Sequence, residues 1–242
     1  MKPAFKLGIL TLTAAFVFGM WLYSAHSVGA ASSGKVSGMV KLEGEAPKQK
    51  VIDMSKEPNC VKIHENNPGK TEAVVVGPNG GLKNVVIYVS EGLNPADAQT
   101  PSQPAEINQQ GCQYHPHVVA LDVNQKLKVI NSDQNSHNIH PLPKQNREWN
   151  KSQPPGAPPF EESFDTPEMI PVKCNVHPWM RSYLAVVKGP YAVSSDDGSF
   201  SLNLSPGTYT LTAWQETYGT QTQKVTVAAG KPATVDFTFK AK

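Results

Sequence analysis

Residues 208–214 read Thr-Tyr-Thr-Leu-Thr-Ala-Trp, with apolar side chains at positions 209, 211 and 213. A period of two residues places one face of a strand in a core and leaves the other face in water. The same alternation recurs in residues 199–204 and 234–239. Turn-forming sequences separate these segments, namely Asp197-Gly198, Pro206-Gly207 and Gly230-Lys231-Pro232. This part of the chain therefore predicts half-buried strands joined by tight turns.

Further strands are predicted upstream, and no segment after the N-terminal region has the pattern of an amphipathic helix. Strands separated by turns, without intervening helices, are typical of sandwiches and barrels. The predicted fold class is all-β. The additional strands are expected at residues 36–42, 84–90, 117–123, 126–131 and 183–188.

The N-terminal segment has the order of features found in export signals. Lys2 and Lys6 precede an apolar run at 7–23, and small residues follow at 27–31. We predict a signal peptide over residues 1–30, with an uncleaved membrane tether as the alternative. Either outcome places the folded part in the periplasm or another exported location, where disulfides persist.

Composition excludes several functional classes. The chain has 22 Lys and Arg against 20 Asp and Glu, and removal of Lys2 and Lys6 leaves equal numbers. Without a basic run along a strand or helix, nucleic acid is not an expected partner. Covalent haem, metalloprotease, serine hydrolase and phosphate-loop motifs are not found, so we expect no enzymatic activity.

Parts of the chain resemble a carboxypeptidase regulatory-like domain, a small immunoglobulin-like or transthyretin-like β-sandwich. That resemblance implies one discontinuous domain, residues 35–100 with 189–242, interrupted by residues 101–188. The competing arrangement is serial, with domains at 35–188 and 189–242. A proline-rich stretch at 94–104 suits a domain boundary, whereas the one at 141–159 suits a long surface loop. The resemblance rests on residues 35–40, 82–89, 197–200 and 205–211.

The residues that carry chemistry lie in two motifs inside 101–188. The first is His137-Asn138-Ile139-His140, and the second is Cys174-Asn175-Val176-His177-Pro178-Trp179-Met180. Together they supply two imidazoles, a thiolate and a thioether, which is the ligand set of a blue-copper electron-transfer site. Cys174 can end a strand, and a tight loop then returns His177 and Met180 to the same point.

In order and spacing, these motifs resemble those of cupredoxins, most closely amicyanin, over residues from about 114 to 188. The resemblance implies a Greek-key β-sandwich that binds one type-1 copper ion. It implies His137, Cys174, His177 and Met180 as ligands. It also gives Asn138 the role of joining the two ligand loops by hydrogen bonds.

The same residues allow other interpretations. Cys174 and His177 have the spacing of half a zinc site, yet the second half is missing and methionine is a poor zinc ligand. His140 lies three residues after His137, and a strand places such positions on opposite faces, so a structural role is expected.

The cupredoxin resemblance also implies that electrons leave near the edge of His177. Pro178 and Trp179 are the predicted exit patch, with a core position for Trp179 as the alternative. A neutral chain is expected to dock through apolar contact. The expected partners are redox proteins such as a c-type cytochrome or a dehydrogenase, with a membrane involved only if the signal stays uncleaved.

The two remaining cysteines, Cys60 and Cys112, are predicted to form a disulfide in an exported chain. The alternative is a second metal site, since His64 lies near Cys60, and His115 and His117 lie near Cys112. The sequence as a whole predicts an exported type-1 copper protein that carries single electrons. Copper delivery or storage without electron transfer is the alternative. An enzyme with an open coordination position is disfavoured by Met180, and a surface binding module is supported by the regulatory-like sandwich alone.

Overall fold

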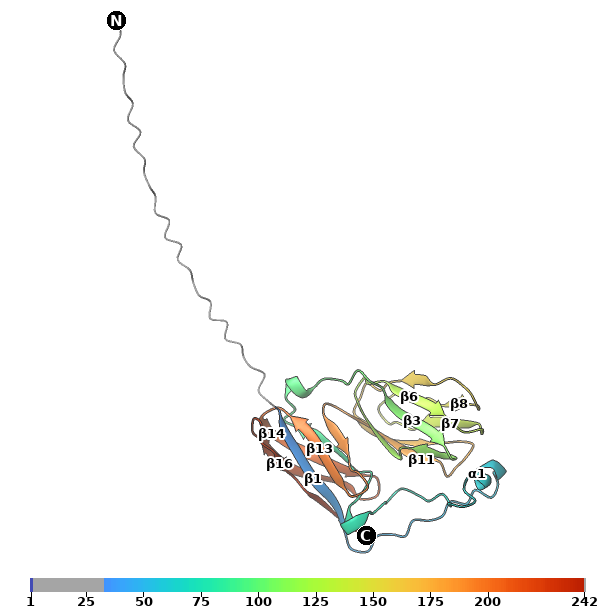
Figure 1. Cartoon of the computed structure of the whole chain (residues 1–242). Coiled ribbons are helices and arrows are strands. Elements are labelled where there is room, and N and C mark those ends of the chain that lie inside the picture. The colour runs from blue at the N-terminus through green and yellow to red at the C-terminus, as the bar shows by residue number, and fades with distance from the viewer. Residues whose placement is uncertain (2–32, 242) are drawn as a thin grey trace. The chain divides into compact units, whose positions relative to one another are not determined.

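The computed structural model describes Met1 and residues 33–241 of the chain (Figure 1). The predicted signal peptide at 1–30 lies outside the described residues, Met1 apart. Strands account for nearly all of the regular secondary structure in the described part, which confirms the all-β prediction. No helix among the described residues is long and apolar enough to cross a membrane.

The first sandwich combines strands from both ends of the chain. One of its sheets has the order β13-β1-β16, with β17 also paired to β1, and the other has the order β12-β2-β14-β15. β1 pairs with β13 in an antiparallel register from Gly34↔Leu204 to Met39↔Ser199. The strands are β1 (Gly34–Glu43), β2 (Val86–Glu91), β12 (Tyr191–Val193), β13 (Ser199–Leu204), β14 (Gly207–Gln215), β15 (Gly219–Val227), β16 (Ala233–Thr234) and β17 (Phe237–Lys240).

The second sandwich is built from the middle of the chain. Its sheets have the orders β5-β11-β10-β7-β8 and β4-β3-β6-β9. The strands are β3 (Ala105–Gln110), β4 (Gln113–His115), β5 (Val118–Asp122), β6 (Leu127–Asn131), β7 (His137–Pro141), β8 (Lys151–Gln153), β9 (Phe160–Glu162), β10 (Glu168–Lys173) and β11 (Arg181–Val187). The boundaries of the two predicted domains stay a prediction.

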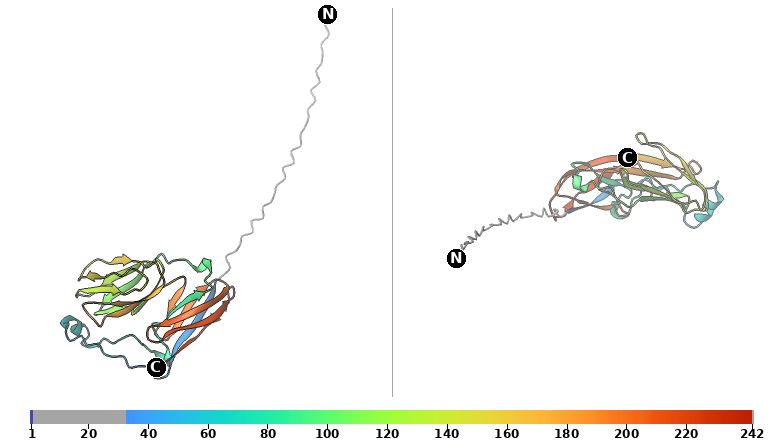
Figure 2. Two further views of the ribbon diagram at one scale, coloured as in Figure 1. Left: turned by 180° about the vertical axis from the view of Figure 1, so that it is seen from behind. Right: turned by 90° about the horizontal axis from the view of Figure 1, so that it is seen from above.

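Each sandwich encloses an apolar core of its own. Val36, Leu211 and Phe237 are among the residues that fill the first core, while Ile139, Ile170 and Leu184 lie in the second. A third cluster joins β2 to β5 and β11 through Val86, Val118 and Ala185. Figure 2 shows the two sets of strands from two further directions.

Short helical turns occupy the connections. They are α1 (Pro58–Ile63), η1 (Pro78–Gly80) and η2 (Pro95–Asp97). In α1 the single buried residue is Cys60, so the turn lacks the apolar face that would have made it visible in the sequence.

Some strands differ from the sequence prediction. The strand expected at 234–239 is divided into β16 and β17, because Asp236 Oδ1 accepts a hydrogen bond from the main-chain N–H of Met39 at 2.8 Å. The proline-rich stretch at 141–159 includes β8, which pairs with β7. β15 was not predicted, because most of its side chains are exposed and polar.

Truncation of Phe237 tests the first core. Its side chain is 1% exposed, so we expect Phe237→Ala to lower the free energy of unfolding by about 3–5 kcal/mol. Urea titration of the purified protein measures this. Thr222→Ala, at an exposed position of β15, serves as the control with an effect below about 0.5 kcal/mol. Equal losses in the two variants would contradict the assigned core.

Candidate metal centre

Three ligand-type side chains meet inside the second sandwich. Nδ1 of His137 lies 2.9 Å from Nδ1 of His177, and Sγ of Cys174 lies 3.8 Å from Nδ1 of His177. The donor atoms all lie within 4.8 Å of one another. The side chains are buried, with exposed fractions of 0% for His137, 2% for Cys174 and 1% for His177. Residues that are up to 40 positions apart in the chain therefore share one buried point.

Strand pairing and a tight loop produce this convergence. His137 opens β7, and Cys174 directly follows β10, which pairs with β7 through Val172↔Pro141. The chain then turns back, because the N–H of Met180 donates to the carbonyl of His177 at 2.9 Å and the N–H of Cys174 donates to the carbonyl of Met180 at 3.3 Å. This loop returns His177 to the end of β7.

Asn138 connects the two segments that carry the donors. Its Oδ1 accepts a hydrogen bond from the main-chain N–H of Asn175 at 2.6 Å, and its own N–H donates to Sγ of Cys174 at 3.5 Å. Its Nδ2 donates to Oδ1 of Asn150 at 2.6 Å, which fixes the amide orientation. These hydrogen bonds join the two segments, and the role that the sequence resemblance gives Asn138 at a metal site stays a prediction.

The local environment favours a thiolate at Cys174. Burial alone raises the pKa of Cys174, but hydrogen bonds from the His137 ring and from the main-chain N–H groups of Asn138 and His177 outweigh burial, so this pKa lies below its ordinary value. Burial likewise lowers the pKa of His137, yet the hydrogen bond to Asp133 and the nearby thiol group bring it above its ordinary value. Both directions favour the charged forms of this pair, a protonated His137 and a Cys174 thiolate, relative to the free side chains.

His177 behaves in the opposite way. Burial lowers its pKa, and the charge on His137 lowers it further, against the opposing effect of Glu57. A neutral imidazole has a lone pair available for a metal. Because metal ligands must be deprotonated, a metal that binds at this point would release whatever protons its ligands carry.

Each imidazole has a carboxylate facing its far nitrogen. Asp133 Oδ2 accepts a hydrogen bond from Nε2 of His137 at 2.8 Å, and Glu57 Oε2 lies 4.0 Å from Nε2 of His177. Asp133 also accepts from the N–H groups of Gly111 and Cys112. Such partners orient metal-binding imidazoles and increase their basicity.

The donor set fits a copper ion. Two imidazole nitrogens and a thiolate are the equatorial ligands of a type-1 site. Their separations of 2.9 and 3.8 Å are shorter than twice an ordinary metal–ligand bond of about 2.0–2.3 Å. His177 is therefore close enough to each of the other two donors to share one ion with it, and all three donor atoms lie within 4.8 Å of one another.

The remaining predicted residues of the second motif surround this point. Met180 is 1% exposed and packs in the same apolar cluster as Cys174. Pro178 is exposed and Trp179 is half-buried. The ring centroid of Trp179 lies 5.2 Å from that of His177. His140 lies outside the donor group, where its nitrogens face Asn175 and Glu148.

His177 is almost fully buried, with an exposed fraction of 1%. The segment that carries Glu57 covers the edge of the His177 ring, and the indole nitrogen of Trp179 donates to the carbonyl of Cys112 at 3.0 Å beneath the same segment. The role of Pro178 and Trp179 as an electron-exit patch stays a prediction.

Cys60 and Cys112 form the predicted disulfide, at a sequence separation of 52 positions. The proposed second metal site is not formed by the nearby histidines. His64 binds the carbonyl of Gly111, and His117 pairs with Glu216. Cys112, Asp133 and His137 also lie close together, but the sulfur of Cys112 is held in the disulfide.

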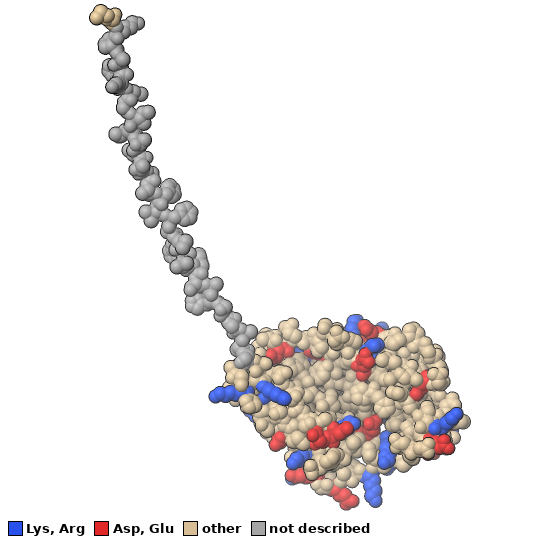
Figure 3. Space-filling view, in the orientation of Figure 1, with Lys and Arg blue, Asp and Glu red and all other residues tan. Residues whose placement is uncertain are grey.

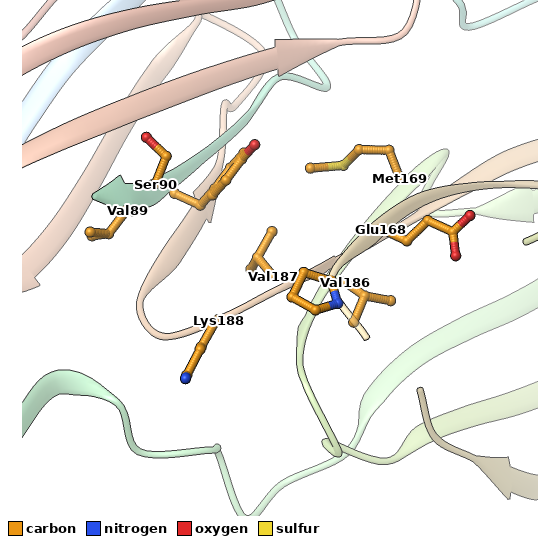
Figure 4. A pocket seen from close by; sticks show the side chains of 9 residues that line it. Val89, Ser90, Glu168, Met169, Val186, Val187 and Lys188 are labelled. Atoms are coloured by element: carbon orange, nitrogen blue, oxygen red, sulfur yellow. The ribbon is translucent and has the colours of Figure 1, made fainter. Parts of the chain in front are cut away.

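A pocket of about 280 Å³ lies between β2 and the strands β10 and β11, away from the donor residues. Figure 4 shows Val89 and Ser90 on one side of it and Val187 and Lys188 on the other. Figure 3 shows basic and acidic side chains interspersed over one face of the molecule, as expected for a nearly neutral chain.

The comparisons with known proteins match separate parts of the chain. Residues 186–240 match the family described as the carboxypeptidase regulatory-like domain, which confirms that resemblance for β12–β17. A search of curated proteins finds no match to the sequence.

Matching solved structures include copper proteins. A copper-containing nitrite reductase from Thermus scotoductus SA-01 is 18% identical with a TM-score of 0.34, and the match covers 40% of this chain and 27% of that chain. A purple cupredoxin from Nitrosopumilus maritimus is 20% identical with a TM-score of 0.30, covering 34% of this chain and 99% of that one. A copper(I) amicyanin variant is 16% identical with a TM-score of 0.32, covering 42% and 98% respectively.

Two carboxylates at the centre were missed by the sequence analysis. Asp133 lies four residues before His137. Once His137 was a candidate ligand, an acidic residue so near in the sequence could have been proposed as its hydrogen-bond partner. Glu57 gave no such signal, because it reaches His177 from a distant segment that the disulfide holds in place.

Replacement of Asp133 tests its effect on His137. We expect Asp133→Asn to weaken copper binding about 10- to 100-fold, because the imidazole loses its charged partner. Competition with a chelator of known affinity measures the change. Asp196→Asn, at a surface ion pair with Lys83, is the matched control and should leave affinity unchanged. Equal affinities for both variants would show that Asp133 does not support the site.

The pKa of Asp133 gives a pH prediction for the metal-free protein. Burial raises this pKa, but the hydrogen bonds from His137, Cys112 and Gly111 outweigh burial and lower it below its ordinary value. A lowered carboxyl pKa stabilises the fold at pH above about 4, and that stabilisation is lost as the pH falls through the folded-state pKa. Asp133→Asn should therefore lose less stability on acidification below pH 5 than the parent protein. Urea titrations at each pH measure this, and parallel curves would refute it.

Proposed function

We propose that the protein is an exported type-1 copper protein that carries single electrons between redox partners. The observation that carries this proposal is the convergence of His137, Cys174 and His177 on one buried point. A copper ion bound there supplies a one-electron couple between its +1 and +2 states.

The residues of the chain have distinct parts in this function. The two imidazoles and the thiolate would hold the ion, and Met180 is proposed as a further, weaker ligand. Asn138 keeps the two donor segments at a fixed separation through Asn175 and Cys174. Because the donors are already packed together, little rearrangement is needed when the charge of the ion changes.

Burial favours a carrier over the alternative of copper delivery. A protein that passes copper to a partner must present its ligands, whereas the three donor side chains here are at most 2% exposed. Electrons, unlike ions, cross a few ångströms of protein without exposure of the ligands. The partners remain proposals: a c-type cytochrome or a dehydrogenase outside the cytoplasm.

Copper reconstitution tests the proposed function. We expect copper(II) to bind the mature protein in a 1:1 ratio and to produce an intense visible absorption from the thiolate–copper bond, with a type-1 electron paramagnetic resonance signal. Cys174→Ser should abolish this colour, because it removes the free thiol of the chain.

Ser182→Ala is the matched control on the adjoining strand, since Ser182 donates to the carbonyl of His117 rather than to a donor residue. It should retain the colour. Colourless binding to the parent protein would favour delivery or storage, and an absence of binding would refute the copper site.

A further inference from the structure

A loop of the chain before β2 covers the metal centre, and we call residues 51–70 the cap. Its two ends are joined by an antiparallel bridge between Val51 and Lys70 and by a hydrogen bond from the N–H of Ile52 to the carbonyl of Gly69 at 2.9 Å. The helical turn α1 lies at the tip, beside the second sandwich (Figure 1). The cap is thus a closed loop that projects from the first sandwich strands to the second sandwich.

The inner side of the cap lies against the candidate metal centre. Met54 and Cys60 pack with Cys112 in a small apolar cluster, and Trp179 borders that cluster. Glu57 brings its carboxylate to 4.0 Å from Nε2 of His177. These contacts explain why His177 is only 1% exposed although it lies in a loop at the end of the sandwich.

Few hydrogen bonds join the cap to the sandwich within the described part of the chain. Nε2 of His64 lies 2.7 Å from the carbonyl oxygen of Gly111, and Nε2 of Gln113 donates to the carbonyl of Lys70 at 3.2 Å. Nδ2 of Asn135 approaches Sγ of Cys60 at 3.4 Å. Hydrogen bonds of this kind contribute little net stability, because water replaces them when a loop opens. A helical turn of six residues with one buried side chain also has little stability of its own.

The disulfide is the covalent connection between the cap and the sandwich, and it lies next to the centre. Cys60 belongs to α1, while the main-chain N–H of Cys112 donates to Oδ2 of Asp133 at 2.7 Å. The same carboxylate oxygen binds Nε2 of His137. Asp133 therefore connects Cys112, where the cap is attached, to the candidate ligand His137.

We propose that the Cys60–Cys112 disulfide acts as a latch that holds the cap closed over His177. While the disulfide is intact, the cap prevents reagents and partner surfaces from contacting this imidazole. Opening the latch breaks one S–S bond and forms two thiols. It consumes two electrons and two protons, which an external dithiol supplies as it becomes a disulfide. The meaning of the latch as control of electron exchange rests on the proposed function, whereas the latch itself does not require copper.

Chemical modification of histidine in the metal-free protein tests the latch. Diethyl pyrocarbonate acylates accessible neutral imidazoles, and peptide mass spectrometry gives the rate at each residue. In the parent protein we expect His177 to react much more slowly than His115, which is exposed. In the double variant Cys60→Ser with Cys112→Ser, we expect the rate at His177 to rise about tenfold or more, because cap opening no longer requires bond cleavage.

Two references separate cap opening from other causes. His117 is buried in the contact between the sandwiches and should stay protected in every folded variant. His64→Ala removes a hydrogen bond of the cap but keeps the disulfide, so it should raise the rate at His177 by less than about threefold. A rise as large as that of the double serine variant would overturn the assignment of the disulfide as the latch.

An unchanged rate at His177 in the folded double variant would also overturn the proposal, as would rapid modification of His177 in the oxidised parent protein. If the double variant exposes His117 as well, it has lost its fold. The parent protein, reduced with dithiothreitol and then reoxidised, then decides. Deprotection of His177 before His117 on reduction, with protection restored on reoxidation, supports the latch, and simultaneous deprotection of both residues overturns it. The assay contains no copper, so its outcome is independent of the copper reconstitution.

Discussion

The candidate centre depends on the hydrogen bonds of Asn138, which join the segment that carries His137 to the segment that carries Cys174. The imidazole and thiol groups on these segments compete for protons. The amide oxygen of Asn138 fixes the loop after β10, and its N–H approaches the sulfur of Cys174. Without this connection, β7 and β10 would still pair at Val172↔Pro141, but the sulfur of Cys174 would lose the N–H group of Asn138. The ligand geometry is thus imposed by the fold before any ion binds.

The centre also shows how buried charge is balanced. Imidazole, thiol and carboxylate groups lie together in a region with little access to water, where an unpaired charge is costly. Asp133 offsets the effect of burial on His137 by raising the pKa of this imidazole. It is itself satisfied by the main-chain N–H groups of Gly111 and Cys112, in the segment that contains the disulfide. Glu57 performs a related role toward His177 from the cap. The same few side chains therefore support the candidate ligands and contact the segments that attach the cap.

Much of this arrangement could be predicted from sequence, because it depends on local patterns. Alternating residues around Leu211 predicted strands, and the spacing from Cys174 to Met180 predicted the ligand loop. The cap could not be predicted, since its position is set by contacts between residues far apart in the chain. β10 was also missed, because Pro171 interrupts its pattern, and β15 was missed because its polar side chains face water. A segment without a regular buried apolar face of its own could not be recognised from the sequence.

The pairing of β1 with β13 and β17 has a consequence for how the chain reaches its native state. Gly34 is aligned with Leu204, and Val40 with Phe237. β1, the first of the described strands to be synthesised, can therefore pair only after β13 and β17 have been made. Contacts of such high sequence separation slow folding, since a long loop must close before they form. The middle strands, whose neighbours lie within 101–188, can meanwhile assemble and bring the chain ends together. Until β13 and β17 are available, the unpaired edge of β1 is open to pairing with other chains.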